Sequence, residues 1–335
     1  MVTIFIFKQY ISAKIESMFK LYIIPIVLLL SIPLLSQRSE RIAFYNVENL
    51  FDTIDGPNND AEFLPAGKKA WNTIKYFEKI NHINKVFCEL NKPMIMGFCE
   101  VENVGVINEI IKNGKSMKGY QIVHYDSQDA RGIDVGMIYN SKKLKLLEDG
   151  FIRYVLPGQT KATSRDIVWA KFSYRKESFY VMVNHWPSRR GGTEKSEPKR
   201  VKAANSARKF IDSLLSINQN TKIILMGDLN DYPSNKSVQL INEKLYPKIT
   251  STSNKFGGTH NYRGEWNILD HICISKGWNE GPLFAHEEDG TILTLEYLLS
   301  TYKGNVVPFR TYGGAKYLGG YSDHLPVYFD LQYKR

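Results

Sequence analysis

Six apolar, strand-like runs of the chain are each followed by polar residues that could bind a metal ion or exchange a proton. Oxygen atoms of carboxylates and amides are the ligands that a hard divalent cation prefers, and imidazoles beside them could move protons or stabilise charge. The polar residues are Asn46, Glu100, His185, Asp228, Asn230, Asp270, Asp323 and His324. Strand ends that deliver this set predict one assembled site.

The oxygen ligands point to a hard metal ion. Glu100 closes the apolar run 95–99, and a carboxylate that closes a buried strand must be solvated, paired or bound to a metal. We expect its neighbour Glu102 to be the solvated member of the two. Asn46 and Asp323 add oxygens that Mg²⁺ or Ca²⁺ accepts, although Asn46 alone also fits a turn that ends a strand. The sequence has no CxxC motif that would indicate zinc.

Asp228 and Asn230 follow the apolar run 223–226. The two-residue period of a strand places both on the same side of the chain, so both can point into one cleft. Together they could orient a water molecule, whereas an Asx turn is the plain structural alternative for this pair.

Two histidines, His185 and His324, belong to this set of polar residues near strand ends, whereas the other histidines do not. Asp270 precedes the apolar run 272–274 and could orient a histidine and raise its basicity. Asp323 and His324 are adjacent, so both reach one site only if the backbone turns, which the glycines at 319–320 allow. His185 follows a separate apolar run. We expect structural roles for His82, His124 and His260.

Residues 1–37 have the features of a secretory signal peptide. The apolar run 21–35 follows Lys14 and Lys20 and is interrupted by Pro25 and Pro33, which predicts cleavage near Gln37. Translation could start at Met1 or Met18, and an uncleaved membrane anchor is the alternative. The remaining residues, 38–335, suffice for one large α/β domain, which we expect to be secreted or periplasmic.

The net charge and the cysteine content place few limits on the class of protein. The net charge of +10 falls to +8 once residues 1–37 are removed. This balance suits a polyanionic partner such as nucleic acid or an anionic membrane surface. Cys88, Cys99 and Cys273 each lie in an apolar stretch, which predicts buried free thiols. One disulfide with a leftover thiol is the alternative.

The chain alternates many strand-like runs with few helices. Two apolar stripes predict helices at 73–90, with Ile74 and Phe77 facing inward, and at 198–217, with Pro198 in the first turn and Arg200 outside. We expect mixed sheets packed face to face with helices outside them. The strand-like runs are 41–46, 93–99, 121–125, 133–139, 168–174, 179–183, 222–226, 269–275 and 325–331, and the expected surface loops are 55–69, 187–198 and 302–320.

The six motifs, in this order, resemble the endonuclease/exonuclease/phosphatase superfamily over roughly residues 40–332. The runs 131–139 and 184–189 resemble its secreted bacterial branch. The resemblance implies a four-layer αββα sandwich of two mixed β-sheets flanked by helices, with the site where the sheets open. It also implies a divalent cation, Mg²⁺ with Mn²⁺ or Ca²⁺ as alternatives, held by Glu100 with Asn46 and Asp323.

The same resemblance assigns catalytic roles. Asp228 and Asn230 would position the attacking water and the phosphate. His324, oriented by Asp270, would act at the phosphate as a base or as an electrostatic stabiliser, and His185 would donate to a phosphate or leaving-group oxygen. Candidate substrate contacts are Arg131, Asn184 and Arg189.

The implied activity is that of an exported metal-dependent phosphodiesterase, and we expect an endonuclease that acts on nucleic acid as a monomer without an obligate protein partner. Basic residues after His185 could follow a phosphate backbone or form an ordinary solvated surface; they are Arg189, Arg190, Lys195, Lys199 and Arg200. The alternatives are a sphingomyelinase-like enzyme, an inositol or sugar phosphate phosphoesterase, and a non-catalytic binding module. A lipid substrate would require an exposed apolar tip, for which Trp278, Phe284 and residues 292–299 are candidates.

Overall fold

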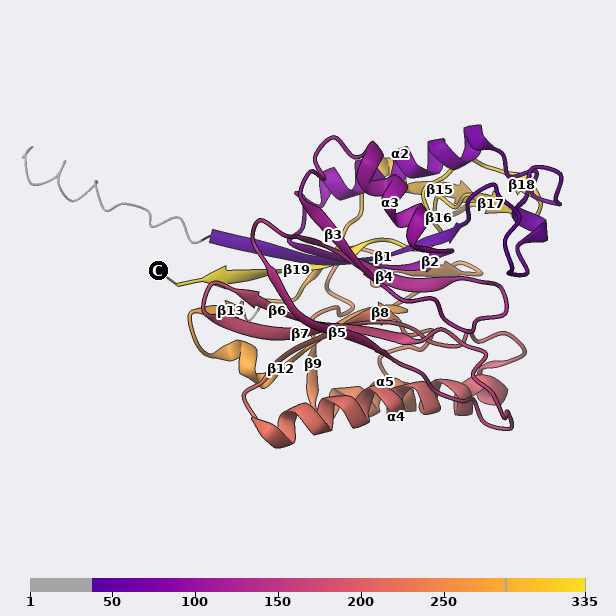
Figure 1. Cartoon of the computed structure of the whole chain (residues 1–335). Coiled ribbons are helices and arrows are strands. Elements are labelled where there is room, and N and C mark those ends of the chain that lie inside the picture. The colour runs from indigo at the N-terminus through magenta and orange to yellow at the C-terminus, as the bar shows by residue number, and fades with distance from the viewer. Residues whose placement is uncertain (1–37, 287, 335) are drawn as a thin grey trace, which may run out of the picture. The chain divides into compact units, whose positions relative to one another are not determined.

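Two mixed β-sheets pack face to face in the computed structural model, which describes residues 38–286 and 288–334 (Figure 1). The first sheet has the strand order β13-β19-β1-β2-β4-β3, and β14 pairs with β19. Its β1 and β2 are parallel, whereas β2 and β4 are antiparallel. The strands of this sheet are β1 (Arg38–Leu50), β2 (Ile95–Val101), β3 (Tyr120–His124), β4 (Asp134–Asn140), β13 (Leu283–Ala285), β14 (Thr291–Ile292) and β19 (Val327–Tyr333).

The second sheet has the order β5-β6-β7-β8-β12-β9. Here β7 and β8 are parallel, and β8 and β12 are antiparallel. The strands are β5 (Lys145–Ile152), β6 (Ile167–Tyr174), β7 (Glu177–His185), β8 (Lys222–Asp228), β9 (Leu245–Pro247) and β12 (Asp270–Ser275).

Helices cover the outer face of each sheet (Figure 1). On the first sheet lie α2 (Thr73–Glu89) and α3 (Val104–Asn113), and on the second lie α4 (Thr193–Ile217) and α5 (Lys236–Asn242). Short 3-10 segments occur at Ala61–Phe63, Lys276–Asn279 and Glu296–Leu298. The predicted four-layer αββα sandwich is therefore confirmed.

The sheets meet across an apolar core at Gly97 of β2. A Cβ atom at this position would lie 2.9 Å from Met226 Cε, 3.1 Å from Val183 Cγ2 and 3.2 Å from Phe44 Cδ2. Met226 and Val183 belong to the second sheet, so only a residue without a side chain allows the two sheets to approach this closely.

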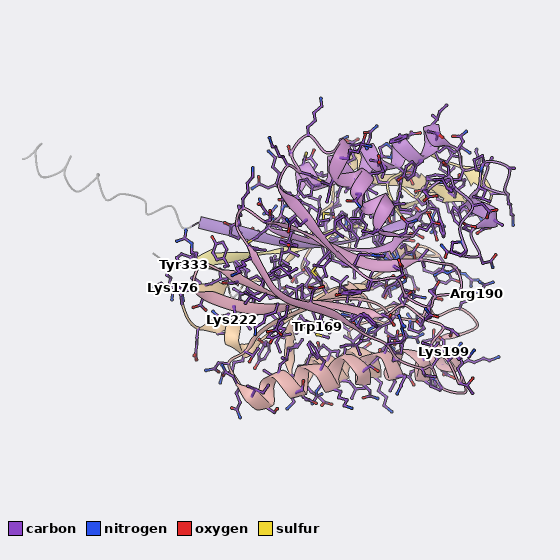
Figure 2. The ribbon with its side chains drawn as sticks, in the orientation of Figure 1. Trp169, Lys176, Arg190, Lys199, Lys222 and Tyr333 are labelled. Carbon is purple, nitrogen blue, oxygen red and sulfur yellow. The ribbon has the colours of Figure 1, made fainter. Side chains whose placement is uncertain are left out.

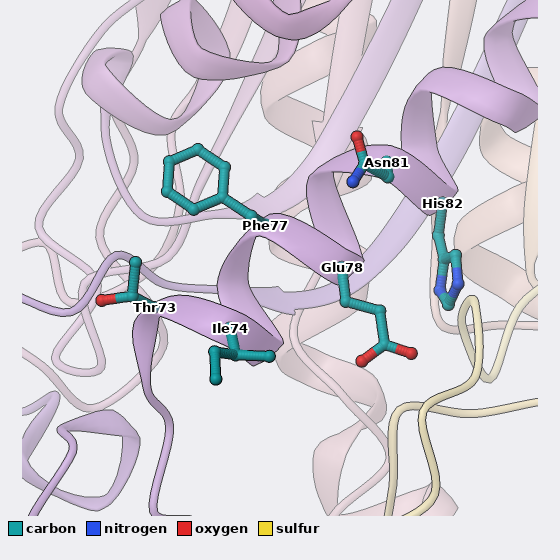
Figure 3. Close-up of a pocket in the computed structure, with 6 residues that line it drawn as sticks. All are labelled: Thr73, Ile74, Phe77, Glu78, Asn81 and His82. Carbon is teal, nitrogen blue, oxygen red and sulfur yellow. The ribbon is translucent and has the colours of Figure 1, made fainter.

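Both predicted helices differ from the expectation in detail. In α2, Ile80 and Ile83 are buried, but Ile74 is 79% exposed and Phe77 is 37% exposed. Figure 3 shows these two residues beside a depression on α2 that is also lined by Thr73, Glu78, Asn81 and His82. The depression is formed by one helix alone.

In α4, the helix begins at Thr193, so Pro198 lies inside it and the preceding loop is shorter than predicted. Arg200, which we expected on the outside, is fully buried, and its Nε lies 2.6 Å from Asp231 Oδ2. A guanidinium that has a buried carboxylate partner can leave the solvent, and an apolar-stripe analysis cannot foresee this partner.

Three two-stranded hairpins lie outside the two large sheets, and the second and third fall largely in the segment 302–320 that was expected to be a loop. They are β10 (His260–Tyr262) with β11 (Glu265–Asn267), β15 (Leu299–Tyr302) with β16 (Asn305–Pro308), and β17 (Tyr312–Gly313) with β18 (Lys316–Tyr317). The prediction that Trp278 could belong to an exposed, membrane-entering tip is wrong. Trp278 is fully buried and donates its indole N–H to Ile223 O. Ile292 and Leu298 are also buried.

Several predictions concern the ends of the chain and the thiols. The proposed signal peptide, residues 1–37, lies outside the described residues. Among the described residues, no helix is both long and apolar enough to cross a membrane. All three cysteines are free; Cys99 and Cys273 are buried as predicted, whereas Cys88 is exposed.

Gly97→Ala should lower the free energy of unfolding by about 1–3 kcal/mol, because the added methyl group would overpack the core between the sheets. Gly313→Ala is the matched control, since its Cβ would meet only the side chain of Leu318, at 3.2 Å or more. Urea denaturation of residues 38–335 measures both. Equal stability of the Gly97 variant and the wild type would contradict the close approach of the sheets.

Candidate active site

One carboxylate oxygen, Oδ2 of Asp228, lies at the centre of the residues selected from the sequence. Asn46 Nδ2 donates to it at 3.1 Å and Asn230 Nδ2 at 3.4 Å. His185 Nε2 lies at 3.6 Å and His324 Nε2 at 3.9 Å from the same oxygen. Asp228 is almost fully buried. Five residues from four separate strand ends or loops therefore converge on one point.

Strand register explains why three of the site residues are neighbours. In the parallel pairing of β7 with β8, His185 lies opposite Asp228. In the antiparallel pairing of β8 with β12, Asp270 lies opposite Asp228 from the other side. Residues opposite one another on adjacent strands have their Cβ atoms about 5 Å apart. The second sheet thus sets His185, Asp228 and Asp270 in one row.

A bulge in the first sheet positions Glu100. The register of β2 shifts between Cys99 and Val101, and Glu100 has a φ of 62°, which is uncommon for a residue with a side chain. Its Oε2 accepts the Asn49 N–H at 2.9 Å, and its Oε1 lies 3.4 Å from Asn46 Nδ2. The bulge turns the carboxylate toward the second sheet, where His185 Nε2 lies 3.9 Å from Oε1.

We had expected Glu102 to be the solvated member of the pair with Glu100, and this prediction is wrong. It is 4% exposed and accepts the Asp52 N–H at 2.7 Å. The bulge at Glu100 changes the alternation of side chains beyond it, so a simple strand period misplaces Glu102.

His324 is held by Asp270 and by a turn at Ser322. Its Nδ1 lies 2.7 Å from Asp270 Oδ2, and its backbone N–H donates to Ser322 Oγ. Ser322 Oγ in turn donates to Asn46 O at 2.7 Å, which fixes the turn against β1. Burial disfavours the charged form of the ring and would lower its pKa. The negative charges of Asp270 and Asp228 have the larger effect, so the pKa of His324 is well above its ordinary value.

The other charges of the site are set mainly by burial. Burial, together with the positive charges of Arg165 and Arg131, holds the pKa of His185 well below its ordinary value, so this ring is neutral. Burial raises the pKa of Asp228 to about 7, even though His324 acts in the opposite direction. The site therefore combines a charged imidazole, a neutral imidazole and a carboxylate that can take up a proton near neutral pH.

Asp323 lies close to Arg310 and to two histidines. It accepts a hydrogen bond from Arg310 Nη2 at 2.8 Å, and it forms a group with His260 and His324 whose ligand atoms lie within 4.8 Å of one another. Burial would raise the pKa of Asp323, but His324 and Arg310 outweigh it and lower this pKa. Asp323 thus lies with Arg310 and the two histidines, whereas Asn46 and Glu100, the other two expected metal ligands, contact each other.

The site contains residues that the sequence analysis missed. We had expected a structural role for His260, yet its ring centroid lies 4.9 Å from that of His324. Burial and the charge of His324 lower the pKa of His260 to about 4. Arg310 was part of an expected loop. Neither residue ends an apolar run, so the signal that found the others was absent.

A buried acid and a buried lysine tie the Arg310 segment to β1. Glu48 accepts the Thr311 N–H at 2.6 Å, and Lys79 Nζ donates to Thr311 Oγ1 at 2.6 Å. Burial raises the pKa of Glu48 to about 7 and lowers that of Lys79 to about 8. Lys79 is a charged residue within the inward-facing apolar stripe of α2. This break in the stripe is the one feature of the sequence that could have indicated a buried lysine with a specific partner.

The three candidate substrate contacts have different environments. Arg131 is exposed, with Nε 3.7 Å from Asp129 Oδ1. Asn184 is fully buried; it accepts from Trp186 Nε1 at 3.1 Å and donates to Met226 O, so protein partners engage both ends of its amide. The Arg189 guanidinium stacks 3.9 Å from the ring centroid of Tyr232.

The site residues fit a hard divalent cation. The carboxylates of Glu100 and Asp228 share one amide donor, because Asn46 Nδ2 donates to both of them. The side-chain oxygen of Asn46 accepts the Glu48 N–H at 2.9 Å. Cys99 is grouped with His185 and Asp228, but burial raises the pKa of its thiol far above the ordinary value. A protonated thiol is a poor ligand, so the available donors are oxygens and a neutral imidazole.

The chain is similar to known proteins over most of its length. A profile of the Endonuclease/Exonuclease/phosphatase family matches residues 41–333. A solved protein of this family from Bacteroides thetaiotaomicron is 16% identical, with 89% of this chain and 99% of that chain covered and a TM-score of 0.60. Comparison with curated proteins gives no significant match.

Two further solved structures share the fold at similarly low identity. The Bacteroides thetaiotaomicron mannosyl-6-phosphatase is 17% identical, with 87% and 99% of the two chains covered and a TM-score of 0.58. D. rerio TDP2 in complex with a single-stranded DNA product is 13% identical, with 88% and 98% covered and a TM-score of 0.57.

Asp228→Asn should stabilise the metal-free protein at pH 8 more than at pH 5. The unfolded aspartate loses its proton near its ordinary pKa, whereas the folded one keeps it to about 7, so wild-type stability falls as the pH rises through this window. Urea unfolding in EDTA measures the effect, with the exposed Asp55→Asn as control. A difference between variant and wild type that does not change with pH would contradict the raised pKa.

Mg²⁺ should raise the melting temperature of the wild type, because a ligand that binds only the folded state stabilises it. Glu100→Gln should abolish most of this shift, while Glu102→Gln, which changes a neighbouring acid outside the proposed ligand set, should retain it. Differential scanning fluorimetry with 0 and excess Mg²⁺ provides the readout. An equal Mg²⁺ shift in Glu100→Gln and the wild type would remove Glu100 from the ligand set.

Proposed function

Since this chain belongs to the endonuclease/exonuclease/phosphatase family, we propose that it is an exported, divalent-metal-dependent phosphodiesterase that cleaves nucleic acid. The observation that carries the proposal is the convergence of two asparagine amides and two imidazoles of opposite protonation state on Asp228 Oδ2. This arrangement suits in-line attack of water on phosphorus, in which the bond to the leaving oxygen breaks as the new P–O bond forms.

The protonation states suggest a different role for each residue of the site. Asp270 and Asp228 raise the pKa of His324, which favours the protonated ring, and in this proposal the ring stabilises charge on the phosphate oxygens. Asp228, with a pKa of about 7, accepts the proton of the attacking water, and Asn230 holds that water beside it. His185, which is neutral, donates a hydrogen bond to the phosphate or to the leaving oxygen.

A divalent cation would neutralise negative charge on the phosphate and activate it for attack. Glu100 would hold the ion with Asn46, and Asp323 completes the ligand set that we propose. Mg²⁺ is the ion that this oxygen-rich donor set suits best.

Exposed cations that follow His185 in the chain support nucleic acid as the substrate. Arg190 and Lys199 are exposed and lie at the same end of the molecule, opposite the end that carries Lys176 and Tyr333 (Figure 2). Arg200 does not contribute, because it is buried against Asp231. Export and a monomeric state belong to the same proposal; export rests on residues 1–37, and the monomer on the sequence alone.

His324→Ala should reduce the rate of cleavage about 10²–10⁴-fold, the range for a positioned imidazole. Purified residues 38–335 would be incubated with supercoiled plasmid in Mg²⁺ and in excess EDTA. His286→Ala is the matched control, because this histidine is exposed at the surface. Mg²⁺-dependent nicking that is lost only in the His324 variant supports the proposal.

Two other results would redirect it. An intact plasmid together with turnover of a sugar phosphate, an inositol phosphate or sphingomyelin would keep the site and replace the substrate. An absence of turnover with every phosphoester would favour a binding module with this fold.

A further inference from the structure

One hairpin adjoins the catalytic histidine, His324. His260, the first residue of β10, forms an isolated antiparallel bridge with His324, and the centroids of the two imidazole rings are 4.9 Å apart. The β10–β11 hairpin therefore starts inside the site and leads outward from it. Because side chains alternate along a strand, Tyr262 lies on the same face as His260, about 7 Å further from the site.

The turn of this hairpin touches a second hairpin. A Cβ atom on Gly264 would lie 3.3 Å from the side chain of Asn305, which belongs to β16. Asn305 lies opposite Tyr302 in the β15–β16 pairing, so both side chains are on the face that is turned toward the first hairpin. The two hairpins thus bring Tyr262 and Tyr302 to adjoining tips.

The tips carry exposed aromatic rings, each with its own cation. Tyr262 is 58% exposed and Tyr302 is 63% exposed. The Arg263 guanidinium lies 5.2 Å from the ring centroid of Tyr262, and Lys303 Nζ lies 5.5 Å from that of Tyr302. An exposed aromatic ring with a neighbouring cation can stack a planar base and attract a phosphate.

We propose that these tips, Tyr262, Arg263, Tyr302 and Lys303, bind unpaired bases of a single-stranded nucleic acid next to the phosphate that is cleaved. A base that is free of its duplex stack can lie on an exposed ring, and a neighbouring cation attracts the phosphate backbone. Glu265, opposite Tyr262 in the hairpin, can accept a hydrogen bond from an amino group of cytosine or adenine. The inference rests on the proposed nuclease function.

A membrane is the less suitable partner. A tip that enters a bilayer needs contiguous aliphatic or tryptophan side chains, whereas these turns carry asparagine, glycine and charged residues beside the tyrosines. Val306, 42% exposed, is the one large aliphatic side chain at the tips that is exposed among the described residues.

The test measures binding of a fluorescent single-stranded oligonucleotide in EDTA by anisotropy. Tyr262→Ala and Tyr302→Ala should each weaken binding by roughly tenfold, as expected for loss of one stacked base, and Tyr262→Phe should retain affinity because the ring remains. Tyr246→Ala is the matched control, since Tyr246 is 55% exposed on β9 in the second sheet. The melting temperature of each variant confirms folding.

Cleavage assays then distinguish a failure of this inference from a failure of the proposed nuclease function. The Tyr262→Ala variant should lose far more activity on the oligonucleotide than on a small diester, bis(p-nitrophenyl) phosphate. If the wild type cleaves nucleic acid but both alanine variants bind it normally, the inference fails and the nuclease function stands. If the wild type cleaves only small diesters, the proposed function fails and this inference with it. Weaker binding of the variants to phosphatidylserine vesicles, with unchanged oligonucleotide binding, would overturn it in favour of a membrane.

Discussion

The burial of the Asp228 carboxylate is the constraint on which the rest of the site depends. A carboxylate removed from water requires donors or a counter-charge, and here it has two amide donors and an imidazolium. Each partner comes from a different part of the chain, so all of them must be in place for the carboxylate to remain buried. The same burial gives Asp228 a pKa near neutrality, and the same imidazolium can stabilise charge on a bound phosphate. Stability and chemistry therefore share one set of contacts.

The two sheets supply these partners in different ways. The second sheet places His185, Asp228 and Asp270 in a row through ordinary strand register. The first sheet requires a bulge and a left-handed φ to turn Glu100 toward that row. Asn230, with a φ of 52°, has a similarly uncommon backbone conformation. Such conformations persist only where surrounding contacts fix them. Here the Asn49 N–H donates to the Glu100 carboxylate, and the Asn230 amide donates to Trp186 O.

Around this centre, substrate recognition would fall to elements outside the two large sheets. Arg310 is placed by Thr311, which is held by Glu48 and Lys79, and the two exposed tyrosines lie at hairpin tips. Loops and hairpins can vary without disturbing a centre that is carried by the sheets. The fold is accordingly shared by a mannosyl-6-phosphatase and by TDP2 in complex with a single-stranded DNA product.

The sequence alone determined the fold class, the family and the set of strand-end residues, because apolar runs and the polar residues that end them are local signals. It could not determine which partners compensate buried charges. Arg200 and Glu102 were expected in solvent, yet Asp231 and the Asp52 N–H allow them to be buried. His260 was expected to be structural, and only the bridge to His324 brings it into the site. The protonation states of His324 and Asp228 were likewise decided by tertiary structure, since each pKa depends on burial and on charges that are distant in sequence.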